Sequence, residues 1–175
     1  MFEGITVSAL SAAGLAVLAG GTFVWAAASD IAAYRIPNLS VLFILALFPA
    51  YSFLAGGAAP LLPHAVVGGA VLILGIPLYA FGFAGAGDFK LLTAAALWAG
   101  PANIVLLLMV MALSGGVLAA AYWLRSRVCM KSAGPAPDPD DDGVVPEGRT
   151  HLPYGVAIST GGLVILAQQM HGLFA

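Results

Sequence analysis

Long apolar runs separated by short polar segments dominate the first 124 residues of the chain. An apolar run of about twenty residues is long enough to cross the hydrocarbon core of a bilayer as a helix. The pattern predicts about six membrane-spanning helices, at residues 5–29, 39–55, 64–83, 88–100, 102–124 and 152–169. We therefore expect an all-α fold, a polytopic membrane protein whose single domain covers residues 1–175.

The fourth predicted helix is short. Its apolar part, from Phe89 to Gly100, would extend for about 18 Å at 1.5 Å per residue, whereas the hydrocarbon core is about 30 Å thick. Either the helix begins earlier or Asp88 itself lies at membrane depth. The polar segment 125–151 has a different character, because its Pro, Gly and Asp content is typical of a flexible linker. We predict that it is a cytoplasmic loop within the domain.

Charge is scarce and unevenly placed. Only 8% of the residues are charged and 61% are apolar, whereas an ordinary soluble domain has about a quarter charged residues. A net charge of −2 offers no basic surface for nucleic acid. Six alternating helices with both termini outside would place every Lys and Arg on the cytoplasmic side, as the positive-inside rule requires: Arg35, Lys90, Arg125, Arg127, Lys131 and Arg149.

Two acidic residues near the predicted helices need an explanation. Asp30 ends the first helix and Asp88 begins the fourth, so the predicted topology places both at the same face. An ionisable side chain within a membrane segment is costly and suggests a functional site. Two neighbouring carboxylates share a proton, so that one can deprotonate water while the other protonates a carbonyl oxygen. Alternatively, Asp30 caps a helix or pairs with Arg35, and Asp88 caps its own helix while Lys90 anchors it.

Three motifs favour catalysis. Residues 85–88 read Gly-Ala-Gly-Asp, Asp30 is followed by Arg-Ile-Pro-Asn at 35–38, and residues 153–157 read Pro-Tyr-Gly-Val-Ala. Together they resemble the GxGD box, the D-x4-R-x-I-P-N element and the P-Y-G-x-A stretch of the type IV prepilin peptidases, which are membrane-embedded aspartic proteases. The resemblance runs from the first predicted helix to the last. It implies that Asp30 and Asp88 are the catalytic pair. Because such a pair activates water by itself, we expect neither a cofactor nor a metal ion.

The same resemblance implies a substrate and a location. The family removes a short, usually basic leader from prepilins, just before their apolar N-terminal helix, at the cytoplasmic face of the inner membrane. The lone Cys129 and the length of the chain leave no room for the two CxxC pairs of the N-methylating members. The chain therefore resembles the short peptidases, which are typical of tight-adherence (Flp) pilus systems and of archaeal preflagellin processing. The Pro-Tyr-Gly-Val-Ala-Ile stretch at 153–158 favours the Flp systems, with pilus or secretion machinery as a further candidate partner.

The remaining candidate site residues have structural alternatives. Gly85 and Gly87 would let a substrate strand approach Asp88, or would only form a turn. Arg35 and Lys90 would attract acidic groups of the substrate or tune the carboxylates, or would only obey the positive-inside rule. The other candidates are residues that end or begin helices and border the site by analogy, namely Pro37, Asn38, Pro153 and Tyr154.

Two other functions are compatible with acids near a membrane. A small proton-coupled transporter would also use such acids as relays, but transporters usually carry matching internal repeats, and the segments around Asp30 and Asp88 do not repeat each other. A non-catalytic subunit of a pilus or secretion assembly would keep the fold and tolerate the loss of either aspartate. The sequence therefore favours the peptidase.

Overall fold

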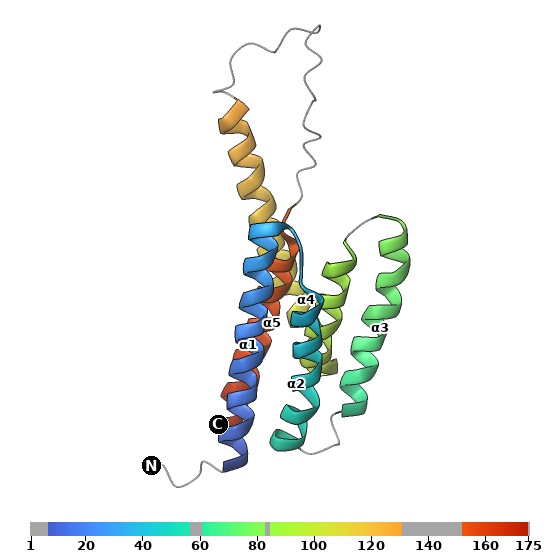
Figure 1. Cartoon of the computed structure of the whole chain (residues 1–175), viewed down its shortest axis with the longest axis vertical. Coiled ribbons are helices and arrows are strands. Elements are labelled where there is room, and N and C mark those ends of the chain that lie inside the picture. The colour runs from blue at the N-terminus through green and yellow to red at the C-terminus, as the bar shows by residue number, and fades with distance from the viewer. Residues whose placement is uncertain (1–6, 57–60, 83–84, 131–151, 175) are drawn as a thin grey trace, which may run out of the picture.

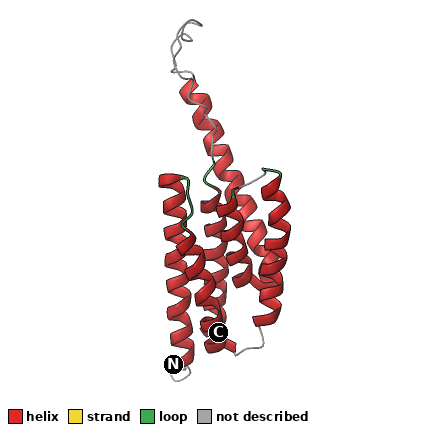
Figure 2. Cartoon of the chain, turned by 45° about the vertical axis from the view of Figure 1, so that its right-hand side comes forward, coloured by secondary structure: helices red, strands yellow, loops and turns green. Residues whose placement is uncertain are grey.

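The computed structural model describes residues 7–56, 61–82, 85–130 and 152–174, and within these ranges every regular element is a helix (Figure 1, Figure 2). The helices are α1 (Val7–Ala33), α2 (Asn38–Gly56), α3 (Leu61–Ala80), α4 (Ala86–Met130) and α5 (Tyr154–Phe174). The predicted all-α architecture is confirmed for this part of the chain. The described residues form five helical elements where the apolar pattern predicts six, because α4 joins two of the predicted helices across a break.

The difference arises at Gly100, where α4 changes direction. Gly100 has φ 62° and ψ −173°, which are not helical values, and such a positive φ is readily adopted only by glycine. The next residue, Pro101, has no backbone N–H to donate to a preceding turn. α4 therefore consists of a first arm, residues 86–99, and a second arm, residues 101–130. These arms correspond to the predicted helices at 88–100 and 102–124.

Contacts with neighbouring helices show that the two arms are antiparallel. Along α3, His64 lies against Gly100 and Gly75 lies against Phe89, so α3 and the first arm run in opposite directions. Along α5, Gly161 packs on Leu107, and the start of the helix, at Tyr154 and Ala157, packs near Gly115. The second arm therefore returns toward the end of the bundle at which the first arm begins, as Figure 1 also shows.

Several predicted boundaries are wrong in an informative way. α1 continues to Ala33 and not only to residue 29, so Asp30 lies inside a helix. The first arm begins at Ala86, two residues before the predicted start. At 1.5 Å per residue it extends for about 21 Å, so it is still shorter than the hydrocarbon core. α4 continues to Met130, so the predicted flexible loop begins too early and Arg125 and Arg127 are helical. The rest of that loop, 131–151, lies outside the described residues.

Four of the described helices are long and apolar enough to cross a membrane: Val7–Ala33, Asn38–Gly56, Leu61–Ala80 and the Ala86–Arg125 part of α4. The fourth of these includes both antiparallel arms. The chain is therefore a multi-pass membrane protein. Much of its apolar surface faces outward, as lipid contact requires, and α3 is the clearest case because it packs chiefly on α4.

One end of the bundle is closed by interlocking aromatic and polar side chains. Trp98 is fully buried and donates from Nε1 to the carbonyl oxygen of Ile44 at 2.9 Å. His64 and Gln169 bind the carbonyl oxygens of Leu97 and Trp98, at 2.8 Å and 2.6 Å respectively. These side chains from α3 and α5 satisfy carbonyls that the end of the first arm leaves without helical partners.

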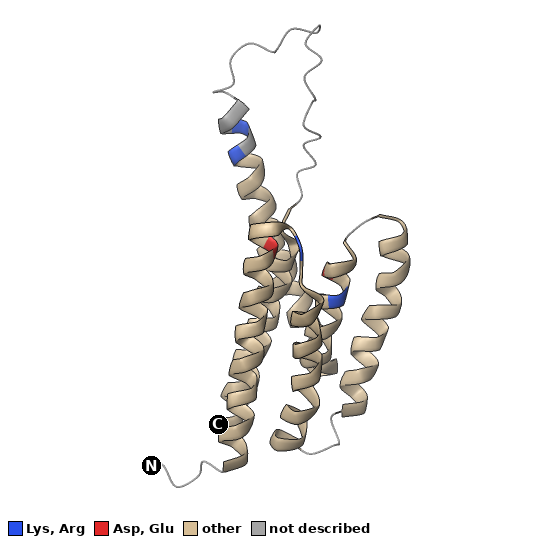
Figure 3. Ribbon diagram, in the orientation of Figure 1, with Lys and Arg blue, Asp and Glu red and all other residues tan. Residues whose placement is uncertain are grey.

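The opposite end carries the charges. The Lys and Arg residues that the structure describes all lie toward it, on the α1–α2 link, the start of α4 and the far end of α4's second arm (Figure 3). α1 begins and α5 ends at the other, closed end (Figure 1). The bundle therefore has one polar end, at which Asp30 and Asp88 lie.

Candidate active site

Asp30 lies in the last turns of α1, next to the point where that helix stops. The backbone N–H of Tyr34 donates to the Asp30 carbonyl oxygen at 2.9 Å, and Tyr34 then adopts a φ of 49°. A left-handed residue at this position ends a helix, although it is usually glycine. Ser29 reinforces the turn by donating from Oγ to the Arg35 carbonyl oxygen at 2.8 Å. The chain then leads through Ile36 into α2.

The Asp30 carboxylate is buried and fixed from a distant part of the chain. It is 6% exposed, and its Oδ2 accepts a hydrogen bond of 2.7 Å from the backbone N–H of Gly155. Gly155 is the second residue of α5, and the first N–H groups of a helix have no partner within it. The positive end of the helix dipole also favours a carboxylate there. Asp30 is therefore held by the N-terminus of α5.

Asp88 is held by its own turn. It lies in the first turn of α4, is half-buried, and accepts at Oδ2 a hydrogen bond of 3.3 Å from the backbone N–H of Gly85. This contact three residues back is half of a capping box. The capping role that the sequence allowed for Asp88 is thus present. It does not remove the carboxylate from the site, because Asp88 also lines the cavity described next.

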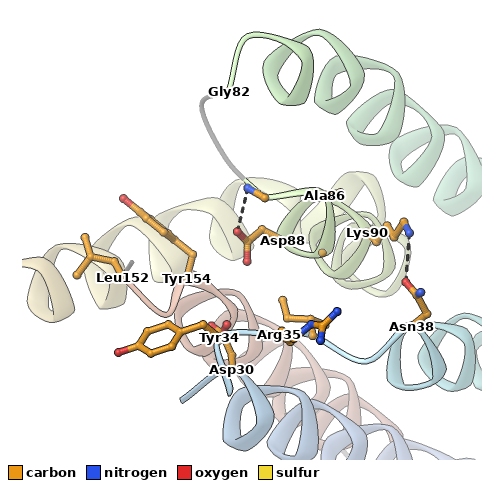
Figure 4. A pocket seen from close by; sticks show the side chains of 13 residues that line it. Asp30, Tyr34, Arg35, Asn38, Gly82, Ala86, Asp88, Lys90, Leu152 and Tyr154 are labelled. Atoms are coloured by element: carbon orange, nitrogen blue, oxygen red, sulfur yellow. Dashed lines mark hydrogen bonds between the residues drawn. The ribbon is translucent and has the colours of Figure 1, made fainter. Parts of the chain in front are cut away.

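One cavity of about 660 Å³ brings the two aspartates together. Figure 4 shows them entering it from different helices, Asp30 from α1 and Asp88 from α4. Most of the residues singled out from the sequence line this cavity, namely Asp30, Asp88, Gly85, Gly87, Lys90, Arg35, Asn38 and Tyr154. The three motifs, which lie far apart in the sequence, therefore contribute residues to one site.

Pro37 and Pro153 do not line the cavity, and each acts at the start of a helix. The carbonyl oxygen of Pro37 accepts hydrogen bonds from the backbone N–H and the Oγ of Ser40, at 3.1 Å and 2.7 Å, in the first turn of α2. Pro153 is buried just before α5, and its carbonyl oxygen accepts from the Val156 N–H at 3.2 Å. Both prolines thus shape the helix starts that carry site residues.

The two cations of the site, Lys90 and Arg35, differ in their contacts. Lys90 donates from Nζ to Oδ1 of Asn38 at 3.1 Å, which links the start of α4 to the start of α2 (Figure 4). Arg35 lines the cavity. Within the described part of the chain, the hydrogen bonds of the Asp30 and Asp88 carboxylates go to backbone N–H groups. The suggested ion pair between Asp30 and Arg35 is not formed there.

Several residues of the site were absent from the sequence-based candidates, and Gly155 and Ile36 are the two with the closest contacts to the aspartates and their neighbours. Gly155 supplies the hydrogen bond to Asp30. The side chain of Ile36 lies between two glycines: a Cβ on Gly87 would be 3.3 Å from Ile36 Cβ, and one on Gly155 would be 3.0 Å from Ile36 Cδ1. Both residues stand inside the motifs that carry the resemblance. Their presence in those motifs was the available signal, but their contacts depend on tertiary packing.

The fold and the site together define a class of protein. Helices apolar enough to span a membrane surround a polar cavity at one end, and this cavity contains two carboxylates that face a shared volume. Such a pair can hold a water molecule and move protons to and from it. The class is that of a multi-pass membrane protein with a two-carboxylate site.

The chain belongs to the type IV leader peptidase family, whose model it matches over residues 16–122, more than half of its length. The matched region contains both Asp30 and Asp88 and ends before α5. Comparisons with curated proteins and with solved structures gave no match. The family confirms the resemblance found in the sequence and makes the protein a membrane peptidase, for which the family implies a prepilin substrate.

Proposed function

We propose that the protein is an aspartic endopeptidase that removes the leader of a type IV, Flp-like prepilin at the cytoplasmic face of the inner membrane. The observation that carries the proposal is that Asp30 and Asp88, on two different helices, line one cavity. Membership of the leader peptidase family supports the substrate class. The sequence contains a single cysteine, Cys129, which favours the Flp-like form without a methyltransferase region.

The chemistry needs only the two carboxyl groups and one water molecule. The ionised aspartate removes a proton from water, and the oxygen of that water attacks the scissile carbonyl carbon. The other aspartate gives its proton to the carbonyl oxygen, which produces a neutral tetrahedral diol. Collapse of the diol breaks the C–N bond. The leaving nitrogen takes up the proton gained from water, and the second aspartate recovers its own from a diol hydroxyl.

The surroundings of Asp88 suit an extended substrate. Gly85 is exposed at the rim of the cavity and Gly87 is half-buried, so no side chain of these residues blocks the approach of a peptide backbone. Lys90 and Arg35 add positive charge to the same cavity. The proposed substrate lies with its cleavage site beside these glycines and its apolar helix within the bilayer.

The distribution of charge supports cleavage at the cytoplasmic face. The described Lys and Arg residues lie toward the cavity end of the bundle, and cytoplasmic ends of membrane helices collect such residues (Figure 3). This orientation places the start of α1 and the end of α5 on the outer side. It also places the cavity where a leader that has not crossed the membrane can reach it.

Substitution of the carboxylates tests the proposal. Asp30→Asn and Asp88→Asn keep the size of each side chain and remove its acid function, so we expect each to lower prepilin cleavage by about 10³-fold or more. Cleavage is followed in membranes by the mobility shift of the processed pilin. Thr22→Ala is the control, because this half-buried α1 residue donates to the Leu18 carbonyl oxygen of its own helix and does not line the cavity. Normal cleavage by both Asn variants would refute the two-aspartate mechanism.

A chelator tests the expected independence from metal ions. Because the carboxyl pair activates water by itself in this mechanism, we expect full cleavage after treatment of membranes with a strong chelator. Loss of cleavage that is restored by added zinc would contradict the proposal and show that a metal ion supplies the activated water.

A further inference from the structure

The N-terminus of α5 makes the closest polar contact of the site. Gly155 N–H lies 2.7 Å from Asp30 Oδ2, shorter than the 3.3 Å between Gly85 N and Asp88 Oδ2. Asp30 and Gly155 are both buried, which limits the competition of water for this bond. Such a charge-assisted bond fixes a carboxylate more firmly than a neutral one would.

The approach of α5 to Asp30 depends on the missing side chain of Gly155. A Cβ at this position would lie 2.7 Å from Asp30 Oδ2, 3.0 Å from Asp30 Cγ and 3.0 Å from Ile36 Cδ1. The contact of 2.7 Å is too short for real atoms and the two contacts of 3.0 Å are tight, so either the carboxylate or the helix has to shift. Alanine at 155 would therefore turn the carboxylate or push the helix away.

Ile36 connects this contact to the other aspartate. Its side chain packs on Gly155 and also on Gly87, the residue directly before Asp88. A displacement of the start of α5 is thus passed through one apolar side chain to the turn that carries Asp88. The two carboxylates come from different helices, and this layer of two glycines and one isoleucine lies between the backbones that carry them.

We propose that Gly155 is a positioning residue of the peptidase: its backbone N–H orients Asp30, and its lack of a side chain lets α5 close against Asp30 and Ile36. The inference rests on the proposed function. It assigns to the last helix, which lies beyond the residues matched by the family model, a direct part in the geometry of catalysis. A carboxylate that is misplaced by 1 Å can cost about 10²-fold in rate.

A matched pair of glycine substitutions tests this role. Gly155→Ala and Gly162→Ala both lie on α5, and each introduces a Cβ with a contact of 2.7 Å, to Asp30 in the first case and to the Phe23 ring in the second. Both changes should lower stability through overpacking. Only Gly155→Ala should also lower kcat per folded molecule, by about 10²-fold with KM nearly unchanged.

Cleavage of a purified prepilin is measured in detergent or in proteoliposomes, and the amount of folded enzyme is determined by thermal unfolding and size-exclusion chromatography. Equal kcat for the two variants per folded molecule would overturn the positioning role. Asp30→Asn is measured in parallel. If that variant also cleaves normally, the aspartic mechanism itself fails; if it is inactive while the glycine variants match, only the role of Gly155 fails.

The double variant Gly155→Ala with Ile36→Val gives a second readout, in which kcat per folded molecule is compared with that of Gly155→Ala. Valine lacks the Cδ1 atom that the new methyl group would meet, so it gives α5 space to settle. We expect kcat to recover by about three- to tenfold relative to Gly155→Ala, and Ile36→Val alone is measured in parallel as the reference for the double variant. No recovery despite restored folding would contradict the role of Ile36 as the connecting side chain.

Discussion

The two aspartates share a cavity but are held by different parts of the molecule. Asp30 is buried, and its partner Gly155 is 125 residues away on α5. Asp88 is half-buried, and its partner Gly85 is three residues away in the same turn. The position of Asp30 thus depends on how α1 and α5 pack, whereas the position of Asp88 depends on where α4 begins.

The Asp30 side of the site therefore fixes its carboxylate, whereas the Asp88 side is open to the substrate. The Asp30 side is tightly packed, with Gly155 and Ile36 in contact with or near the carboxylate. The Asp88 side has Gly85 exposed and Lys90 exposed at the rim. A site of this kind has to align a water molecule and also admit a peptide. A rigid Asp30 side serves the first need, and an accessible Asp88 side serves the second. The first prediction tests this division directly.

Lengthening each carboxylate by one methylene should affect the two sides unequally. Asp30→Glu has to fit a longer side chain into a buried space beside Gly155, so we expect cleavage to fall by about 10²-fold or more. In Asp88→Glu the longer chain can still reach the Gly85 N–H, because Glu is a favoured residue at this capping-box position. We expect a loss of only about tenfold. The measurement is kcat for prepilin cleavage per folded enzyme.

The comparison between the two variants is the test, since any single loss could reflect general damage. Thermal unfolding of each variant serves as the control, and Asp30→Glu should also be the less stable of the two. An Asp88→Glu variant that loses as much cleavage as Asp30→Glu, or more, would mean that both sides are equally rigid. The division between a fixed and an accessible carboxylate would then be wrong.

The same difference explains which parts of the site could be predicted from sequence. The environment of Asp88 is local, so the Gly-Ala-Gly-Asp box predicts both its glycine turn and its capping bond. Asp30 could be identified as a site residue because acids near apolar segments are rare. Its partner could not, because a hydrogen bond across 125 residues depends on how two helices pack. Gly155 stands in the Pro-Tyr-Gly-Val-Ala stretch, but that stretch does not indicate which residue its backbone N–H contacts.

The fold shows the same limit. Apolar runs predict the helices well because each run reflects one helix at a time. The sequence predicts one helix on each side of residue 100, and these are the two arms of α4. It does not predict that the arms are joined directly at Gly100, with a φ of 62°. The polar residues from Arg125 suggested a loop, whereas α4 continues to Met130 beyond the apolar part. A helix that leaves an apolar environment needs no apolar residues, so hydropathy alone cannot mark its end.

The accessible side can also be perturbed from α3. A Cβ on Gly75 would lie 2.7 Å from Phe89 Cδ1, and Phe89 directly follows Asp88. Gly75→Ala should shift the first turn of α4 and lower kcat by about three- to tenfold, a smaller loss than at Asp30 because the half-buried turn can adjust. Gly69→Ala on the same helix has open space around the new methyl group and is the control. Equal cleavage by the two variants would show that α3 does not position Asp88.

The smallest effect is expected at the bond between Lys90 Nζ and Asn38 Oδ1, which joins the Asp88 turn to the start of α2 at 3.1 Å. Lys90 is exposed, and a hydrogen bond of this kind contributes about 0.5–1.5 kcal/mol at most. Lys90→Met and Asn38→Ala should each lower kcat/KM by about two- to threefold. The double variant should lose no more than either single one, because both changes remove the same bond. A much larger loss in Lys90→Met than in Asn38→Ala would instead assign Lys90 a direct contact with the substrate, and the accessible side would then bind as well as admit it.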